Sequence, residues 1–176
     1  ARIATVHALG DIWAMGADPQ AALVSLILPR QSDALQTRML TEIMAGIQQE
    51  LSAACSAIAG GHTTTGSELT IGLTVTGLAG SRILTKAGAQ PGDVLILTKP
   101  IGSGTLLAAE MAKEAPGRAI AALFPYLAQS QADAARHFAP HAHAMTDVTG
   151  FGLAGHLDEI LRASYVSADL DLTAIP

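Results

Sequence analysis

An apolar run followed by a long amphipathic segment constrains the fold of this chain more than any other feature. Residues 21–28 are apolar except for one serine, and Pro29 ends the run, which is typical of a buried β-strand. From Asp33, the expected N-cap, to about Ile58, apolar residues recur at helical spacing and predict a long helix. Helix and strand patterns that follow one another in this way place the chain in the α/β or α+β class.

The same patterns predict further elements in the first half of the chain. A helix is expected over residues 2–16, where Gly16 ends it, and Gly60-Gly61 is expected to stop the long helix. Residues 68–78 alternate and are rich in Thr, Ile and Val, which predicts a strand. The expected order of the first unit is therefore α, β, α, β.

Residues 84–92 are rich in turn-forming residues and predict a linker between two units. We therefore divide the chain into residues 1–85 and 86–176. The second unit is expected to contain a strand over 93–98, a helix over 103–113, helical segments over 117–138 and 153–163, and a strand over 167–172.

Composition and charge exclude several classes of function. Of the 176 residues, 49% are hydrophobic and 14% are charged, which is enough apolar material for a packed core. The net charge is −5 and the ten Lys and Arg residues are scattered, which argues against nucleic acid as a partner. No apolar run has the roughly 18 residues of a membrane span, and the first residues lack a secretory pattern, so we expect a cytoplasmic protein without membrane contact. The single Cys55 is expected to pack on the apolar face of the long helix.

One carboxylate, Asp147, lies in a Thr- and Gly-rich turn within the segment from Met145 to His156. Free backbone N–H groups at such a turn bind anions, and Mg²⁺ needs only one or two carboxylates beside substrate phosphates. In the alternative interpretation Asp147 only caps the turn, and Gly150 and Gly152 permit its backbone angles. Spacing alone favours this simpler alternative.

A second candidate site is Gly60-Gly61-His62-Thr63, where paired glycines let the backbone approach a ligand and the side chains offer donors to phosphate or ribose. A Gly-Gly pair is also a common helix stop, and a lone histidine is more often structural. Asp11 lies in an otherwise apolar stretch, so it is either a metal ligand or an ordinary exposed helical position.

A third candidate is the Gly-Ser-Gly turn that follows Lys99, because a strand that leads through such a turn into a helix can hold an anion. Lys99 precedes the glycines and the full Walker pattern is absent, so a plain strand-to-helix turn explains the segment equally well.

Taken together, these segments resemble the selenophosphate synthetase family, which belongs to the wider group of aminoimidazole ribonucleotide synthetase-like enzymes. The resemblance covers essentially the whole chain, and the last of its segments is very specific. The segments stand in the family's order: Gly10-Asp-Ile-Trp-Ala-Met-Gly16, Ala59-Gly-Gly-His-Thr63, Glu68 with Gly72-Leu-Thr-Val-Thr-Gly77, Leu97-Thr-Lys-Pro-Ile-Gly102 and Met145-Thr-Asp-Val-Thr-Gly-Phe-Gly-Leu-Ala-Gly-His-Leu157.

The resemblance implies a two-domain architecture, truncated here at both ends. Residues 1–85 would be part of an N-terminal ATP-binding domain that forms a homodimer, and residues 86–176 part of a C-terminal α+β domain. Family members convert selenide, ATP and water to selenophosphate, AMP and phosphate, with Mg²⁺ and often K⁺. By this resemblance, Asp11 matches an aspartate that touches metal and ATP, and Asp147 matches a second metal-binding aspartate.

The resemblance also assigns Gly60, Gly61 and His62, with the adjoining Thr63, to a loop that contacts nucleotide and is shared with the partner subunit. The family's nucleophilic Cys or selenocysteine lies in an N-terminal segment that matches nothing in these residues, and Cys55 does not match it. We therefore expect no catalytic nucleophile here and no activity from these 176 residues alone.

Two alternatives to this function stay open at the level of sequence. One is another ATP-using enzyme of the superfamily, such as thiamine monophosphate kinase or aminoimidazole ribonucleotide synthetase, although the Thr146–Gly152 segment argues against it. The other is a non-catalytic dimerisation or nucleotide-binding module that retains the motifs for folding.

Overall fold

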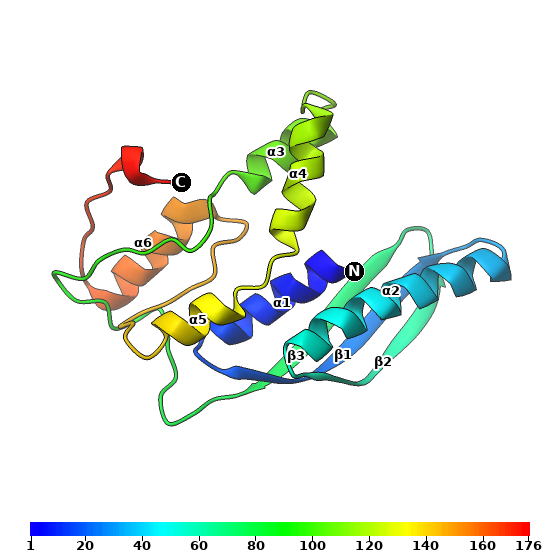
Figure 1. Ribbon diagram of the computed structural model, residues 1–176, viewed down its shortest axis with the longest axis horizontal. Helices are drawn as coiled ribbons and strands as arrows, with labels where there is room; N and C mark the ends of the chain where they lie inside the picture. The colour runs from blue at the N-terminus through cyan, green and yellow to red at the C-terminus, as the bar shows by residue number, and fades with distance from the viewer.

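The first half of the chain is a three-stranded sheet with two helices across one of its faces (Figure 1). The computed structural model describes all residues, 1–176. The strand order is β2-β1-β3, with β1 parallel to β2 and antiparallel to β3. The elements of this half are α1 (Arg2–Ala14), β1 (Asp18–Pro29), α2 (Asp33–Ala53), β2 (Ala57–Gly66) and β3 (Thr70–Leu78).

The core lies between β1 and the two helices. Alternate residues of β1 point toward the helices and are buried, as expected for a central strand that is covered on one face. Full burial of a valine, leucine or isoleucine side chain stabilises a fold by about 1.5–3 kcal/mol. The ten buried residues of this core are Val6, Leu9, Trp13, Ala22, Val24, Leu26, Leu28, Ile43, Ile47 and Leu51.

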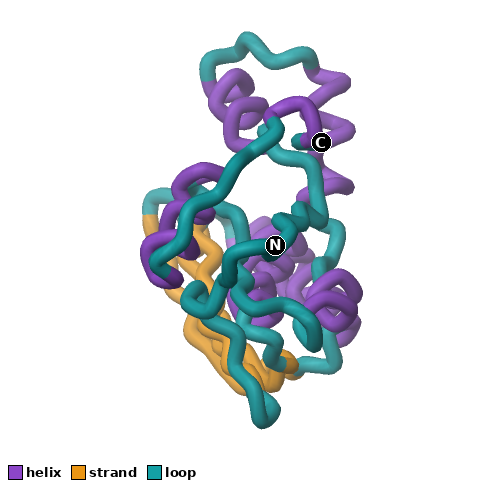
Figure 2. The backbone as a smooth tube through the Cα atoms, turned by 90° about the vertical axis from the view of Figure 1, so that its left-hand side faces the viewer, coloured by secondary structure: helices purple, strands orange, loops and turns teal.

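No helix of this chain covers the opposite face of the sheet. On that face Leu23 is 51% exposed, and it pairs with Gly60 of β2 and Thr74 of β3. Ser25 lies two residues further along the same face and pairs with His62. Figure 2 shows the strands gathered toward one side of the molecule. We call this surface the outer sheet face.

The second half of the chain is helical and irregular. The segment after β3 approaches α1, because the backbone N–H of Leu84 donates to the carbonyl oxygen of Met15 at 3.0 Å. Helix α5 packs against α1 beside the core. None of the helices has both the length and the apolar character that a membrane span would need. The elements of this half are α3 (Ser103–Met111), α4 (Gly117–Leu127), α5 (Ala132–Phe138), α6 (Gly152–Ser164) and a short 3₁₀ helix (Leu172–Ala174).

Most of the predicted elements are confirmed. The helices expected over 2–16, 103–113 and 153–163 correspond to α1, α3 and α6, and the strands expected over 21–28 and 68–78 correspond to β1 and β3. The helical segment predicted over 117–138 is present but is divided into α4 and α5.

The prediction that the long helix runs to about residue 58 and stops at Gly60-Gly61 is wrong. Helix α2 ends at Ala53, and both glycines lie inside β2, a strand that the sequence did not predict. Its Gly- and Thr-rich composition lacks the alternating apolar pattern of a half-buried strand. Pairing with β1 nevertheless forms it, since β1 supplies backbone partners from residues 21 to 29.

Two predictions about the ends of this helix are also wrong. Cys55 is exposed and has a left-handed φ of 55°, because it lies in the turn between α2 and β2 and not on the helix face. The N-cap is Ser32, so Asp33 is the first helical residue, where its charge complements the positive end of the helix dipole.

The predicted strands over 93–98 and 167–172 are absent. Val94 in the first is 83% exposed, and Leu172 in the second is 75% exposed and begins the 3₁₀ helix. An apolar alternating segment becomes a strand only when another strand pairs with its backbone. Neither segment has such a neighbour in this chain.

The packing of β2 on β1 predicts different effects for substitutions at two adjacent glycines. A Cβ atom on Gly61 would lie 2.0 Å from the carbonyl oxygen of Val24, whereas one on Gly60 would meet only Leu23 Cδ2, at 3.5 Å. We expect Gly61→Ala to lower the free energy of unfolding by about 1–3 kcal/mol, and Gly60→Ala to lower it by less. Urea unfolding of both variants measures this difference, and equal effects would contradict the described contact.

Candidate functional site

The structure brings the segment of Asp147 to the end of α1, the helix that carries Asp11. The backbone N–H of Met145 donates to the carbonyl oxygen of Thr85 at 3.3 Å, and that of Leu84 donates to the carbonyl oxygen of Met15 at 3.0 Å. Asp11 is on the solvent-facing side of α1, between the buried residues Leu9 and Trp13. Asp147 is half-buried in the segment that leads into α6. Partial desolvation and then the negative charge of Asp147 raise the pKa of Asp11, while the nearby His7 and Lys86 lower it.

This pair of carboxylates has a donor set that fits a hard cation. Neither Asp11 nor Asp147 forms an ion pair with a basic side chain. The chain contains no group of three or more His, Cys, Asp and Glu side chains placed to hold a metal. Mg²⁺ is commonly bound by one or two carboxylates together with substrate phosphates and water, so two carboxylates suffice for that ion.

Four side chains form a hydrogen-bonded chain beside the carboxylate pair. Lys86 Nζ donates to Glu159 Oε2 at 2.7 Å, and the same oxygen lies 3.1 Å from Nδ1 of His156. His156 Nε2 lies 3.1 Å from the hydroxyl of Thr149, two residues after Asp147. The hydrogen bonds from Lys86, and secondarily from His156, hold the pKa of Glu159 below its ordinary value. We call Lys86, Glu159, His156 and Thr149 the α6 network.

The segment Gly60-Gly61-His62-Thr63 lies on β2, at the opposite edge of the sheet from β3, the strand against which α1 and its Asp11 pack. No hydrogen bond or ion pair of the chain joins its side chains to Asp11 or Asp147. His62 is exposed and shares the outer sheet face with Ser25. The structure therefore unites the two predicted metal ligands but does not bring the predicted nucleotide segment to them within one chain.

Lys99, beside the Gly-Ser-Gly turn, has a structural role in this chain. Its Nζ donates to the backbone carbonyl oxygens of Tyr126 at 3.0 Å and Gln129 at 2.6 Å, and it lies 5.9 Å from the centre of the Tyr126 ring. These carbonyls are at the C-terminal end of α4, where a cation is favourable. Partial burial lowers the pKa of Lys99. The interpretation of this segment as a plain turn into α3 is therefore the better one, although no strand precedes the turn.

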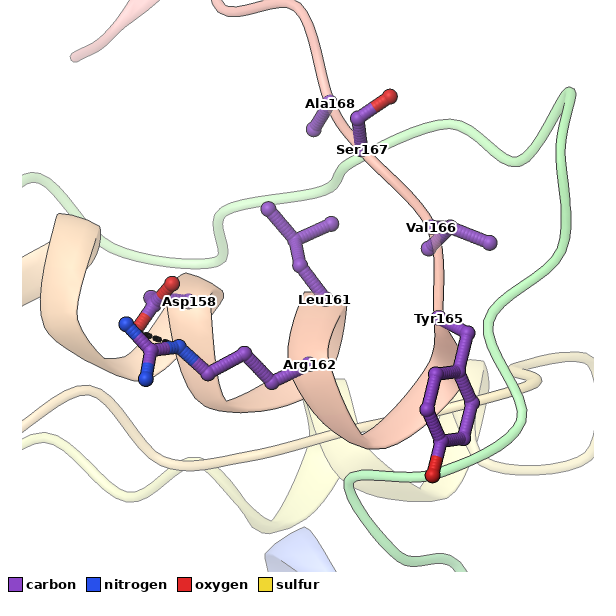
Figure 3. Close-up of a pocket in the computed structure, with 7 residues that line it drawn as sticks. All are labelled: Asp158, Leu161, Arg162, Tyr165, Val166, Ser167 and Ala168. Atoms are coloured by element: carbon purple, nitrogen blue, oxygen red, sulfur yellow. Dashed lines mark ion pairs between the residues drawn. The ribbon is translucent and has the colours of Figure 1, made fainter.

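A hollow of about 600 Å³ lies at the C-terminal end of α6 and is lined by residues of that helix and of the segment that follows it. Figure 3 shows Asp158 and Arg162 on α6, joined as an ion pair at 2.8 Å, with Tyr165 to Ala168 on the segment that follows the helix. Tyr165 is 96% exposed, so the hollow is open to solvent. It contains none of the predicted metal or nucleotide residues.

Two family models match this chain. The model described as AIR synthase related protein, N-terminal domain, matches residues 1–79, and the model for the C-terminal domain matches residues 90–176. The chain belongs to the AIR synthase related family. The two-domain architecture predicted from the sequence is thus confirmed.

Curated relatives of this AIR synthase related chain are selenide, water dikinases. The enzyme of Myxococcus xanthus is 41% identical over 180 residues, which cover 99% of this chain and 50% of that protein. The enzyme of Trichlorobacter lovleyi is 41% identical over 179 residues, with 99% and 51% covered. The chain thus spans about half the length of the curated relatives it matches.

Solved structures share the fold. Thiamine-monophosphate kinase from Stenotrophomonas maltophilia superposes with a TM-score of 0.80 at 25% identity, covering 97% of this chain and 55% of that one. Hydrogenase maturation protein HypE in complex with ATP superposes with a TM-score of 0.73 at 19% identity, covering 93% and 50%. At these identities the likeness supports the AIR synthase related fold and does not identify the substrate.

Sequence reasoning missed the α6 network. The spacing of His156 and Glu159, three residues apart on a helix, indicates that they share a face, and this signal was available. Nothing in the sequence connects Lys86 to them, because that contact depends on how the segment after β3 passes α6.

The proximity of the two carboxylates predicts a measurable shift in the pKa of Asp11. The negative charge of Asp147 disfavours ionisation of Asp11, so Asp147→Asn should lower the pKa of Asp11. Carboxyl NMR titration of Asp11 measures the change. Asp133→Asn, at a side chain that is 96% exposed on α5, is the control and should leave that pKa unchanged. An unchanged pKa in Asp147→Asn would contradict the pairing.

Proposed function

We propose that the protein carrying this chain forms selenophosphate from selenide, ATP and water, with release of AMP and phosphate. The observation that carries the proposal is the 41% identity to the selenide, water dikinase of Myxococcus xanthus over 99% of this chain. The convergence of Asp11 and Asp147 supports it, because a reaction on ATP phosphates needs a place for the accompanying cation.

In this proposal Asp11 and Asp147 are the metal ligands, and Asp11 also contacts ATP. Mg²⁺, when bound, would neutralise charge on the phosphates during their transfer. The chain's own contribution is to hold the two carboxylates at fixed positions on α1 and before α6. K⁺ is proposed as a further cofactor on the strength of the family resemblance alone.

Gly60, Gly61, His62 and Thr63 are proposed to contact the nucleotide from β2. Their exposure on β2 supports this role. We also propose residues 1–85 and 86–176 as parts of two domains. The intervals matched by the two family models, 1–79 and 90–176, are compatible with that boundary. A cytoplasmic location and the inactivity of these 176 residues alone stay predictions.

The nucleotide product tests the proposed reaction. The full-length protein, incubated with ATP, Mg²⁺ and selenide, should release AMP in a selenide-dependent manner, and Asp147→Ala should reduce the rate by at least about 100-fold because a metal ligand is lost. Nucleotide chromatography measures the product. Asp133→Asn, exposed on α5, is the matched acidic control and should retain activity. ADP as the product, or AMP without selenide dependence, would instead favour a related kinase or ligase.

We further propose that the outer sheet face is where two copies associate as a homodimer. Leu23 is half-exposed in the centre of this face, and Ser25 and Ile27 extend the surface along β1. One bare face is unusual for a strand with a parallel neighbour, since sheets that contain parallel pairs are generally covered on both sides. His62 lies on the same face, so association there would place the proposed nucleotide segment at the subunit boundary.

Two leucines of equal exposure provide a test of the dimer. Leu23 on the outer sheet face is 51% exposed, and Leu35 on α2 is 52% exposed. Leu23→Glu should convert the dimer to monomers, because it places two charges in an apolar contact, whereas Leu35→Glu should not. Sedimentation equilibrium measures the oligomeric state. A dimer that survives Leu23→Glu but dissociates with Leu35→Glu would move the interface to the helical face.

A further inference from the structure

The α6 network connects the segment after β3 to the segment before α6 through one buried histidine. His156 is only 5% exposed, and both of its ring nitrogens have partners: Glu159 at Nδ1 and Thr149 at Nε2. The ring of Phe151 also lies against it, with the ring centres 5.5 Å apart. A buried polar ring that is satisfied on both sides and packed on a third has a single well-defined position.

The direction of the hydrogen bonds follows from the charge of Glu159. A carboxylate only accepts, so Lys86 and the Nδ1–H of His156 both donate to it. In the neutral ring, Nε2 is then an acceptor and receives the hydroxyl proton of Thr149. The hydroxyl of Thr149 is thereby fixed in orientation, together with the backbone that carries it.

Each end of this network lies beside one of the two proposed metal ligands. Thr149 follows Asp147 by two residues in the same short segment. At the other end, Lys86 lies two residues after Leu84, whose backbone N–H donates to the carbonyl oxygen of Met15 at the end of α1, the helix that carries Asp11. Helix α6 therefore contacts both the segment that carries Asp147 and the segment after β3, which is hydrogen-bonded to the end of α1.

We propose that His156 and Thr149 are positioning residues, which fix the Asp147 segment relative to Asp11 so that the two carboxylates are preorganised to share one divalent cation. This inference rests on the proposed function of Asp11 and Asp147. Groups that orient metal ligands in this way typically change metal affinity by about 10- to 100-fold when they are removed.

A purely structural network would behave differently. If the hydrogen bond between Thr149 and His156 only satisfies a buried imidazole, its loss lowers the stability of the fold but leaves the cation affinity of the folded protein unchanged.

The network also explains Gly155, since a Cβ atom there would lie 2.7 Å from the Cβ of Phe151 and would displace the ring that packs on His156.

The test uses two substitutions at Thr149 in the full-length protein. Thr149→Val keeps the shape of the side chain and removes the hydroxyl, whereas Thr149→Ser keeps the hydroxyl. Mn²⁺ affinity in the presence of β,γ-methylene-ATP is measured by electron paramagnetic resonance, and hydrogen exchange of the amides of residues 146–151 is measured without metal. We expect Thr149→Val to weaken Mn²⁺ binding by about tenfold and to speed exchange, and Thr149→Ser to restore both.

The outcomes separate this inference from the proposed function. If Asp147→Asn abolishes Mn²⁺ binding while Thr149→Val binds Mn²⁺ as tightly as the wild type, the metal site stands and the positioning role is overturned. If the wild type binds no Mn²⁺, the proposed metal role fails, and with it the purpose of the network. Unchanged exchange in Thr149→Val would overturn the positioning role by itself, because the segment is then held by other contacts.

Discussion

The packing of α1 and α2 on one face of β1 is the constraint on which the rest of the structure depends. Leu9 and Trp13 fix α1 against the sheet, so Asp11, which lies between them in sequence, emerges from the helix at a defined place. Helix α5 and the segment after β3 then pack against α1 and bring the second half of the chain alongside. The position of one carboxylate is thus a consequence of the hydrophobic core.

The electrostatics of the carboxylate pair follow from that arrangement. Partial burial of Asp11 and the nearby negative charge of Asp147 raise the pKa of Asp11, and no ion pair to either carboxylate offsets this. Such an arrangement lowers stability and is typical of functional sites, where a bound cation removes the repulsion. By contrast, Glu159 is paired with both Lys86 and His156, so its charge is stabilised within the chain. Glu159 has ion-pair partners within the chain, whereas Asp11 and Asp147 have none, and this difference separates the proposed ligand positions from the supporting network.

The sequence predicted the helices and strands that have a periodic pattern of apolar residues. It did not predict correctly where a strand forms only if a neighbouring strand pairs with it. Strand β1 and helix α2 carry strong periodic patterns, and both are present. Strand β2 has no such pattern. It is a strand because its backbone pairs with β1 and not because its own side chains alternate. Residues 93–98 have the pattern without a partner strand, and they are irregular. Alternating apolar residues therefore indicate a segment that can be buried, but the segment becomes a strand only if another strand is available to pair with its backbone.

The residues of the candidate site could be predicted from the sequence, but their arrangement in space could not. Spacing alone did not distinguish Asp147 from a turn cap, and Asp11 was equally consistent with an exposed helical position. The family resemblance selected both residues, and the fold then brought them near each other from opposite halves of the chain. The contact of Lys86 with Glu159 joins residues 73 apart in sequence, so no local pattern could have indicated it.

The central claim is that Asp11 and Asp147 share one cation at the phosphates of ATP. The most direct test is a crystal structure of the full-length protein with Mn²⁺ and β,γ-methylene-ATP, in which the anomalous signal of manganese locates the ion. The account predicts a manganese peak between the carboxylates of Asp11 and Asp147, in contact with phosphate oxygens. Manganese and nucleotide bound elsewhere, for example in the open hollow beside Arg162 and Tyr165, would contradict it.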